Sequence, residues 1–211
     1  MSKLPKKPSR FSLNRLSNRF SNDQLLFVKS LVQSPSEIGQ VAPSSRFLAE
    51  CMVSKLDLAH ARVVVEYGPG TGSVTRAILA RLGSQTAFFA IESNATMVSI
   101  LRRRFPGVEI VHDSAERVGH YLQQYKLDQA DYIISSLPFS LLPSELRRAI
   151  IENSYQSLRT GGAFVAYQYI HASLLKRSSV MRAQMRYTFR HVDSTVILRN
   201  LPPAFVFQCL K

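Results

Sequence analysis

Three glycines and a carboxylate lie close together in the segment EYGPGTG (66–72). The glycines are Gly68, Gly70 and Gly72, and they follow the apolar run VVVEY (63–67) and precede an amphipathic segment. A strand, a glycine-rich turn and a helix in that order form a nucleotide site at the carboxyl edge of a sheet, because glycine lets the backbone approach a ligand closely. The segment therefore predicts that the chain binds a small molecule containing a nucleoside.

Two glutamates narrow the choice of nucleotide. Glu92 ends the next apolar run 24 residues after Gly68, where a carboxylate can accept hydrogen bonds from both hydroxyls of a ribose. That position suits either NAD or S-adenosylmethionine. The spacing is GxGxG, whereas GxGxxG suits a pyrophosphate at a helix N-terminus. Glu66 would also repel a pyrophosphate but suits a ligand with an ammonium and a sulfonium, so both details favour S-adenosylmethionine.

The elements that must position these residues are predicted to alternate along the chain. Strands are expected at 63–67, 87–92, 108–113, 131–136 and 162–169, and helices at 74–82, 95–105, 118–125 and 145–158. Short apolar strands separated by helices are typical of a parallel sheet with helices on both faces. Segments 189–198 and 204–210 indicate an antiparallel hairpin after that sheet. The pattern therefore predicts an α/β fold.

The composition is that of one domain with anionic partners. With 211 residues and 45% hydrophobic side chains, the chain is large enough for one packed core. The formal charge of +13 favours a nucleic acid or an anionic membrane. Cys51 and Cys209 have no neighbouring His or Cys at a metal-ligand spacing, so we expect free thiols and no metal site. No run approaches the ~18 apolar residues that cross a bilayer, so we expect a cytoplasmic protein, attached to a membrane only from the side.

The N-terminal segment, residues 1–38, is predicted to be a basic tail followed by an amphipathic helix, and residues 39–211 the remaining domain. One helical face carries Leu13, Leu16, Phe20, Phe27 and Leu31, and the other carries Arg15, Arg19 and Lys29. Such a helix can lie in the interface of an anionic membrane, or it can pack over the sheet as a lid. The two interpretations are compatible if the helix that lies in the membrane interface also forms the lid.

Two further segments are predicted to form surface features. A helix should begin after Pro43, capped by Ser44 or Ser45, and end near Leu56. A second basic group lies between the fifth strand and the hairpin and consists of Lys176, Arg177, Arg182, Arg186 and Arg190. This group is either a solvated surface or a second patch that faces a membrane.

The motifs together resemble a known family. EYGPGTG, AIE ending at Glu92, HDSA (112–115) and GG (161–162) are similar to the ordered motifs of class I S-adenosylmethionine-dependent methyltransferases. The resemblance implies a Rossmann-like, seven-stranded, mostly parallel sheet whose last strand is antiparallel, in agreement with the expected hairpin. The implied cofactor site consists of Glu66, Gly68, Gly70, Gly72, Glu92, Asp113, Ser114, Ala115 and Ser135. Within it Asp113 would accept from the adenine amino group, although it could also cap the helix that follows.

A closer resemblance is to the bacterial phospholipid N-methyltransferases. It covers roughly residues 20–211 and is carried by IGQVAPSSRFLAECM (38–52), SSLPFSLLP (135–143) and the two tyrosines of YQY (167–169). Those enzymes methylate phosphatidylethanolamine stepwise toward phosphatidylcholine. The resemblance implies that activity here, with an aminolipid and an anionic membrane surface as partners. An ornithine-containing lipid is a close alternative, and a membrane-binding adaptor that retains the nucleotide pocket is a distant one.

The reaction would be an in-line attack of a neutral amine on the sulfonium methyl, which needs positioning and exclusion of water more than a strong base. The groups predicted near the methyl are Ser136, Phe139, Tyr167 and Tyr169. Aromatic rings there would stabilise a methylated cation, and Tyr169 could relay the proton. The residues predicted to bind the lipid are Ser45, Arg46 and Pro138, with Arg46 at the phosphate.

An adenine N6-methyltransferase acting on ribosomal RNA is the rival from another substrate class. Those enzymes share the glycine turn but carry NLPY where this chain has SLPF (136–139). Their Asn carbonyl accepts an amino hydrogen of adenine and orients the nitrogen lone pair, and Ser136 has no amide carbonyl to do so. Nucleic acid is therefore the less favoured partner, and the sequence does not indicate the oligomeric state.

Overall fold

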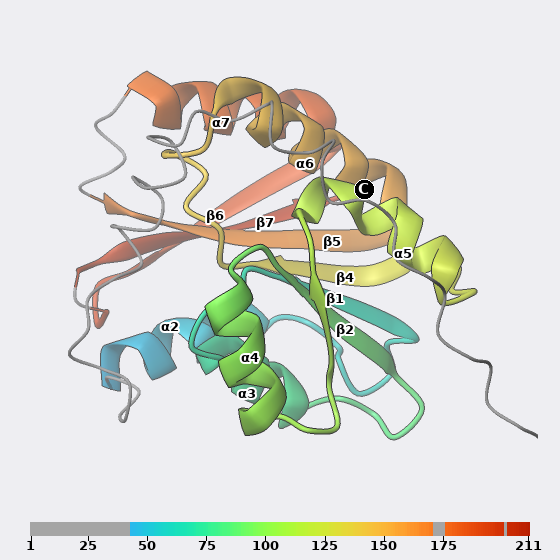
Figure 1. Cartoon of the computed structure of the whole chain (residues 1–211). Helices are drawn as coiled ribbons and strands as arrows, with labels where there is room; N and C mark the ends of the chain where they lie inside the picture. Colours follow the sequence, from blue (N-terminus) through green and yellow to red (C-terminus); the bar gives the residue numbers. More distant parts are fainter. Residues whose placement is uncertain (1–42, 171–175, 201) are drawn as a thin grey trace, which may run out of the picture. The chain divides into compact units, whose positions relative to one another are not determined.

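The apolar runs of the chain form seven strands of a single sheet. The computed structural model describes residues 43–170, 176–200 and 202–211 (Figure 1). The strands are β1 (Val63–Tyr67), β2 (Ala87–Glu92), β3 (Glu109–His112), β4 (Ala130–Ser135), β5 (Leu158–Tyr169), β6 (His191–Ile197) and β7 (Ala204–Leu210). Every residue of β1 is buried, as expected for a central strand covered on both faces.

The strand order confirms the expected Rossmann-like architecture. The order is β3-β2-β1-β4-β5-β7-β6, and β1 to β5 pair in parallel. Strand β7 inserts between β5 and β6 and is antiparallel to both, so the expected C-terminal hairpin is confirmed. The direction of winding reverses between β1 and β4, and such a reversal opens a crevice at the carboxyl ends of the strands.

Helices cover both faces of the sheet (Figure 1). One face is covered by α2 (Pro43–Val53), α3 (Ser73–Leu79) and α4 (Ala95–Arg104), and the other by α5 (Val118–Gln124), α6 (Ser144–Ser157) and α7 (Lys176–Thr188). A short 3₁₀ helix, η3 (Ala115–Arg117), precedes α5. Alternate residues of β1 divide between the two layers, because Val64 joins the core beneath α2 and α3 while Val65 joins the core beneath α5, α6 and α7.

Helix α7 was missed in the sequence, where its segment was interpreted only as a basic surface group. Met181, Met185 and Phe189 recur every four residues and are at most 3% exposed, so they form a helical apolar stripe against the sheet. The Phe189 ring stacks on Phe164 of β5 at 5.8 Å between centroids. Three arginines and one lysine among the 13 residues of α7 indicated a charged surface and drew attention away from this spacing.

Other boundaries differ by a few residues from those predicted. Helix α2 begins at Pro43, so Ser44 and Ser45 lie in its first turn instead of preceding it as caps. Proline fits that place because its missing N–H is not needed there. The predicted N-terminal segment, residues 1–38, and its boundary with the remaining domain lie outside the described residues.

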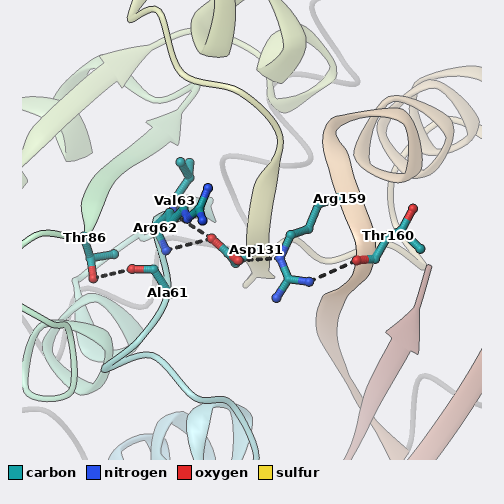
Figure 2. A network of polar contacts seen from close by, with 7 residues as sticks. All are labelled: Ala61, Arg62, Val63, Thr86, Asp131, Arg159 and Thr160. Carbon is teal, nitrogen blue, oxygen red and sulfur yellow. Dashed lines mark hydrogen bonds and ion pairs between the residues drawn. The ribbon is translucent and has the colours of Figure 1, made fainter.

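A buried carboxylate joins three strands at the amino edge of the sheet (Figure 2). Asp131 Oδ2 accepts from the backbone N–H groups of Arg62 and Val63 at 2.8 and 2.9 Å, and Oδ1 pairs with Arg159 Nε. The paired glycines 161–162 also belong to this edge, since Gly161 has φ 77° and a Cβ at Gly162 would lie 2.9 Å from the Asp131 carbonyl oxygen. That motif therefore shapes the start of β5, away from the crevice.

Within the described residues, no helix has the length and apolar character that crossing a membrane requires.

Candidate active site

The glycine turn between β1 and α3 lies at the carboxyl edge of the sheet. Gly68, Gly70 and Gly72 have φ of 61°, 53° and 84°, a region that residues with a Cβ rarely adopt. The Gly68 N–H donates to the Ile91 carbonyl oxygen at 2.9 Å, which ties the turn to the end of β2. A Cβ at Gly68 would lie 2.7 Å from Leu137 Cδ2, so the turn packs directly on the loop after β4.

Gly70 is the one glycine of this turn with open space beside it. A Cβ at Gly70 would meet nothing nearer than the Gly68 carbonyl oxygen at 3.9 Å, whereas a Cβ at Gly72 would lie 2.4 Å from the Phe105 ring. Gly68 and Gly72 thus allow close packing within the protein. Gly70 leaves the outer side of the turn free for a ligand.

Glu92, at the end of β2, holds the turn with both of its carboxylate oxygens. Oε2 accepts from the Gly70 N–H at 3.2 Å, and Oε1 accepts from the Asn94 N–H at 2.8 Å. Burial raises the pKa of Glu92, and the backbone N–H groups of Asn94, Gly70 and Ser93 oppose that rise. Each oxygen retains a further lone pair, which is the capacity that two ribose hydroxyls need.

Glu66 is fully buried beneath the N-terminal end of α3. Its Oε2 accepts from Thr75 Oγ1 at 2.7 Å, while Oε1 finds no hydrogen-bond partner among the described residues. Burial raises its pKa to about 8, and the nearby Glu92 adds to the rise, while the hydrogen bond from Thr75 opposes it. The cation expected from the sequence would therefore meet a carboxyl group that one hydroxyl already orients.

Asp113 follows β3 at the same edge, and residues of the helical segments η3 and α5 that come next hold its side chain. Its Oδ2 accepts from the Tyr121 hydroxyl and pairs with Arg117 Nη1 at 2.9 Å, while Oδ1 accepts from the Ser114 N–H at 2.7 Å. Burial and the bond to Asp113 raise the pKa of Tyr121 to about 12, so the phenol stays protonated and donates. Ser114 is the N-cap of η3, and Ala115 packs in the core. Any adenine contact by Asp113 would use the acceptor capacity that remains.

The loop after β4 presents an unsatisfied hydroxyl. The Ser136 N–H donates to the Tyr67 carbonyl oxygen at 2.9 Å, and Ser135 Oγ accepts from the Leu137 N–H at 3.3 Å. Ser136 Oγ is buried and has no hydrogen-bond partner within the described part of the chain. A buried hydroxyl without a hydrogen-bond partner destabilises the folded protein, so Ser136 Oγ is a good candidate for a ligand contact. Pro138 follows in the same loop and is half-buried.

The Phe139 side chain, unlike that of Pro138, is fully buried. It is 1% exposed and packs edge-on against Phe164 at 5.9 Å between centroids. The ring therefore belongs to the core beneath α6 and α7, and a role at the methyl group would require it to leave that packing.

Tyr167 and Tyr169 lie together at the end of β5, on the opposite face from Phe164. Their rings meet edge to face at 5.3 Å between centroids, and both pack against the core beneath α2 and α3. Burial, together with Tyr169, raises the pKa of Tyr167. Tyr167 is therefore a neutral phenol at physiological pH, and the pair offers aromatic surface beside the strand ends.

The predicted lipid-binding residues are only partly brought together. Arg46 is exposed on α2 and lines a groove with residues of α3, and Pro138 is not among the described residues of that lining. The side chain of Ser45 lies outside the described part of the structure.

Four contributors were missed in the sequence. They are Thr75, which orients Glu66, Asn94, which holds Glu92, Leu137, which covers Gly68, and Phe105, which covers Gly72. Only Asn94 had a readable signal, because an Asn before an amphipathic run is typical of an N-cap, and its side chain does cap α4. The others act through contacts distant in sequence.

The acceptor groups and the open side of the turn fit S-adenosylmethionine. The open side of Gly70, the spare lone pairs of Glu92 and the unpartnered Oε1 of Glu66 are the features that a ribose and a cationic amino-acid moiety need. Among the described residues, no group of three or more His, Cys, Asp or Glu side chains is placed to hold a metal ion.

Comparisons with known proteins agree with this geometry. Residues 64–162 match the family described as "Methyltransferase domain". An ornithine lipid N-methyltransferase from Singulisphaera acidiphila is 30% identical over 190 residues, which covers 89% of this chain and 95% of that one. A probable ribosomal RNA small subunit methyltransferase A from Thermococcus onnurineus is 30% identical over 118 residues, but this covers only 55% of this chain and 40% of that one.

Solved structures share the fold. The N-methyltransferase NodS from Bradyrhizobium japonicum, in complex with S-adenosyl-L-homocysteine, has a TM-score of 0.67 at 11% identity and covers 90% of this chain and 99% of its own. An O-methyltransferase from Bacillus cereus in complex with the same product has a TM-score of 0.62 at 15% identity and covers 92% and 94%.

Proposed function

Because the chain belongs to the S-adenosylmethionine-dependent methyltransferases, we propose that it transfers methyl groups to the primary amine of a membrane lipid. The observation that carries the proposal is the extent of the likeness to the ornithine lipid N-methyltransferase, 89% of this chain. The likeness to ribosomal RNA methyltransferases ends at about half of the chain. Cofactor binding alone would explain the shorter match, whereas a match over 89% of the chain supports a likeness that extends beyond the cofactor site.

The loop after β4 also supports an alkyl amine over adenine. Adenine N6 has its lone pair in the ring system, so an amide carbonyl must orient it, and Ser136 offers only a hydroxyl. A protonated alkyl amine needs to lose one proton and then has a free lone pair. One hydrogen-bond acceptor and an apolar surround are sufficient for that nitrogen.

When bound, S-adenosylmethionine supplies an electrophilic methyl group on a sulfonium. The neutral amine, once its ammonium form has given a proton to water, would form the N–C bond as the C–S bond breaks, and S-adenosylhomocysteine would leave with the electron pair of that bond. In the proposal Ser136 Oγ accepts from one amine N–H and so turns the lone pair toward the methyl. Tyr167 and Tyr169 would face the other side of the substrate nitrogen, where their rings would stabilise the methylated ammonium by about 0.5–2 kcal/mol. Glu92 holds the ribose through its two oxygens.

Two headgroups are candidates for the amine. The curated relative acts on an ornithine lipid, which makes that class the first to test. The motifs SSLPFSLLP and YQY resemble the phosphatidylethanolamine enzymes, which makes that lipid the second. Both present a primary amine on a flexible chain beside an anionic group, so the same site chemistry serves either.

The test uses labelled S-adenosylmethionine and purified protein, with separate vesicles that contain ornithine lipid or phosphatidylethanolamine and with ribosomal RNA in parallel. We expect label in one of the lipids and none in RNA. Ser136→Ala should lower kcat by about 3- to 10-fold, the value of one hydrogen bond, and leave the affinity for S-adenosylhomocysteine unchanged. Label in RNA without label in either lipid would reject the proposal.

Attachment to the inner face of the cytoplasmic membrane is part of the proposal, because the substrate resides there. The basic N-terminal segment is the first candidate anchor, since each Arg or Lys near an anionic surface contributes about 1 kcal/mol. Arg15→Glu with Arg19→Glu should reduce flotation with anionic vesicles. Unchanged flotation would assign the anchor to another surface.

A further inference from the structure

A groove of about 470 Å³ lies along α3 and is lined by residues of α2, α3 and α4. These three helices cover the same face of the sheet (Figure 1). Its lining includes Arg46 of α2, Arg76 of α3 and Arg104 at the end of α4, together with the small residues Ala77 and Ala80. Three arginines from three helices thus line one concavity. This convergence was not visible in the sequence, where the three arginines are 30 and 28 residues apart.

The described part of the chain places no ion-pair partner beside the three arginines of the groove. Glu50 is the single acid among the described residues of the lining, and its Oε2 is held by Arg81. Within the described residues, Arg46, Arg76 and Arg104 form no ion pair. Arg104 Nη1 donates to the Thr71 carbonyl oxygen, which leaves the other donors of this guanidinium for a ligand. The groove therefore retains the capacity to bind an anion with several oxygens.

The groove is separate from the methyl-transfer site. Among the described residues, its lining contains none of those at the ends of β2, β4 and β5 that form that site, and none with an aromatic ring. A single-stranded nucleic acid is held by a basic groove with aromatic rings that stack on the bases. The absence of rings from this lining favours a smaller anion.

The surroundings of the groove indicate where that anion resides. On the helices that line the groove, Phe47 follows Arg46 in the sequence and Leu79 precedes Ala80, and each of these two large apolar side chains is 37% exposed. Guanidinium groups beside exposed apolar side chains are typical of a surface that lies in a membrane interface, where the charges meet headgroups and the apolar side chains enter the acyl boundary.

We propose that this groove binds the phosphate of an anionic membrane lipid that is not itself methylated. The inference rests on the proposed function for its membrane setting, but it concerns a different site and a different lipid. Arg46 and Arg76 bind the phosphate oxygens, Arg104 links the groove to the glycine turn through Thr71, and Phe47 and Leu79 contact the acyl boundary. The bound headgroup places the face with α2 and α3 on the membrane.

The test measures binding of the full chain to vesicles without S-adenosylmethionine, so it does not depend on turnover. The groove variant is Arg46→Gln with Arg76→Gln, and the matched control is Arg62→Gln with Arg148→Gln, two exposed arginines outside the groove lining. Both variants lose two positive charges. Arg104 is left in place because it supports the glycine turn.

We expect the groove variant to bind vesicles of phosphatidylglycerol mixed with phosphatidylcholine about 30-fold more weakly than the wild type, from about 1 kcal/mol per arginine. The control should lose at most a few-fold, and binding to pure phosphatidylcholine should not separate the two variants. Thermal unfolding and S-adenosylhomocysteine binding of both variants establish that the fold is intact.

Equal losses in the two variants would overturn the inference, because the effect would then be one of net charge. Groove-dependent binding of inorganic phosphate or glycerol phosphate at the vesicle affinity would reassign the groove to a soluble anion, and groove-dependent binding of an RNA oligonucleotide would reassign it to nucleic acid. Wild-type protein that binds anionic vesicles through the groove but methylates no lipid would instead reject the proposed function alone.

Discussion

Glu66 and Glu92 are both buried acids at one turn, yet their hydrogen bonds give them different tasks. Glu92 receives backbone N–H groups on both oxygens, which favours the carboxylate and fixes its orientation. Glu66 receives one hydroxyl and leaves Oε1 unpaired, so burial dominates its titration. Glu92 is therefore suited to hold the ribose, and Glu66 to respond to a nearby cation.

Substitution of Glu66 should change the pH dependence of stability. Its folded pKa of about 8 lies above the unfolded value, so the folded state binds the extra proton and wild-type stability falls as pH rises from about 4.5 to 8. Glu66→Gln removes this loss. The free energy of unfolding of the variant, relative to the wild type, should increase by about 2 kcal/mol between pH 6 and pH 8 in cofactor-free denaturant titrations. A difference that stays constant across this range would contradict the assignment.

Substitution of Glu92 should act on the cofactor. In Glu92→Gln, the amide NH₂ would face one of the two backbone N–H donors, Gly70 or Asn94. The substitution also removes a charged acceptor, and hydrogen bonds to charged groups contribute about 1.5–3 kcal/mol. We expect calorimetry to show an affinity for S-adenosylhomocysteine about 30-fold lower. Glu109→Gln, at the exposed start of β3, should leave the affinity unchanged.

The glycine turn is an element whose three glycines are required for different reasons. Leu137 and Phe105 approach Gly68 and Gly72 within the protein, whereas the space beside Gly70 is open. The GxGxG spacing alone assigns no such difference, since all three positions have positive φ.

Two alanine substitutions should separate packing from ligand binding. Gly72→Ala should lower the free energy of unfolding by about 2–3 kcal/mol, because the Cβ adds a clash with Phe105 to the cost of the left-handed conformation. Gly70→Ala should cost only about 1 kcal/mol but weaken cofactor binding more strongly. Denaturant titration and calorimetry on both variants test this contrast, and an equal loss of stability in the two would show that the turn is rigid throughout.

At the scale of the whole molecule, Asp131 joins the starts of β1, β4 and β5 (Figure 2). Although burial acts in the opposite direction, the Val63 N–H, the Arg159 side chain and the Arg62 N–H hold the pKa of Asp131 below its ordinary value. Its stabilising contribution is therefore present above about pH 4 and is lost as the pH falls through the folded pKa.

Asp131→Asn should lower the free energy of unfolding at neutral pH by about 2 kcal/mol, since an uncharged amide replaces a carboxylate that holds three donors. The curves of variant and wild type should converge below about pH 4. Asp128→Asn, at an exposed site, is the control. A loss that persists at low pH would point to packing instead of charge.

Much of the fold was readable because it depends on local patterns. The limits of β1, β2 and β7 were predicted without error, since a buried strand is a short apolar run whatever surrounds it. The insertion of β7 between β5 and β6 is a pairing choice between distant segments, and it depends on which apolar faces meet. Helix α7 was missed for a related reason, because its apolar stripe is defined by the core that it covers.

The chemistry of the candidate site divides in the same way. Residue types and spacing were sufficient for the nucleotide turn, the ribose carboxylate and the methyl donor, because each depends on backbone conformation or charge at one position. The unpaired oxygens of Glu66 and Ser136, the burial of Phe139 and the convergence of Arg46, Arg76 and Arg104 came only from the folded chain. Burial, hydrogen-bond satisfaction and convergence are properties of neighbours brought together from distant parts of the sequence, and no local pattern encodes them.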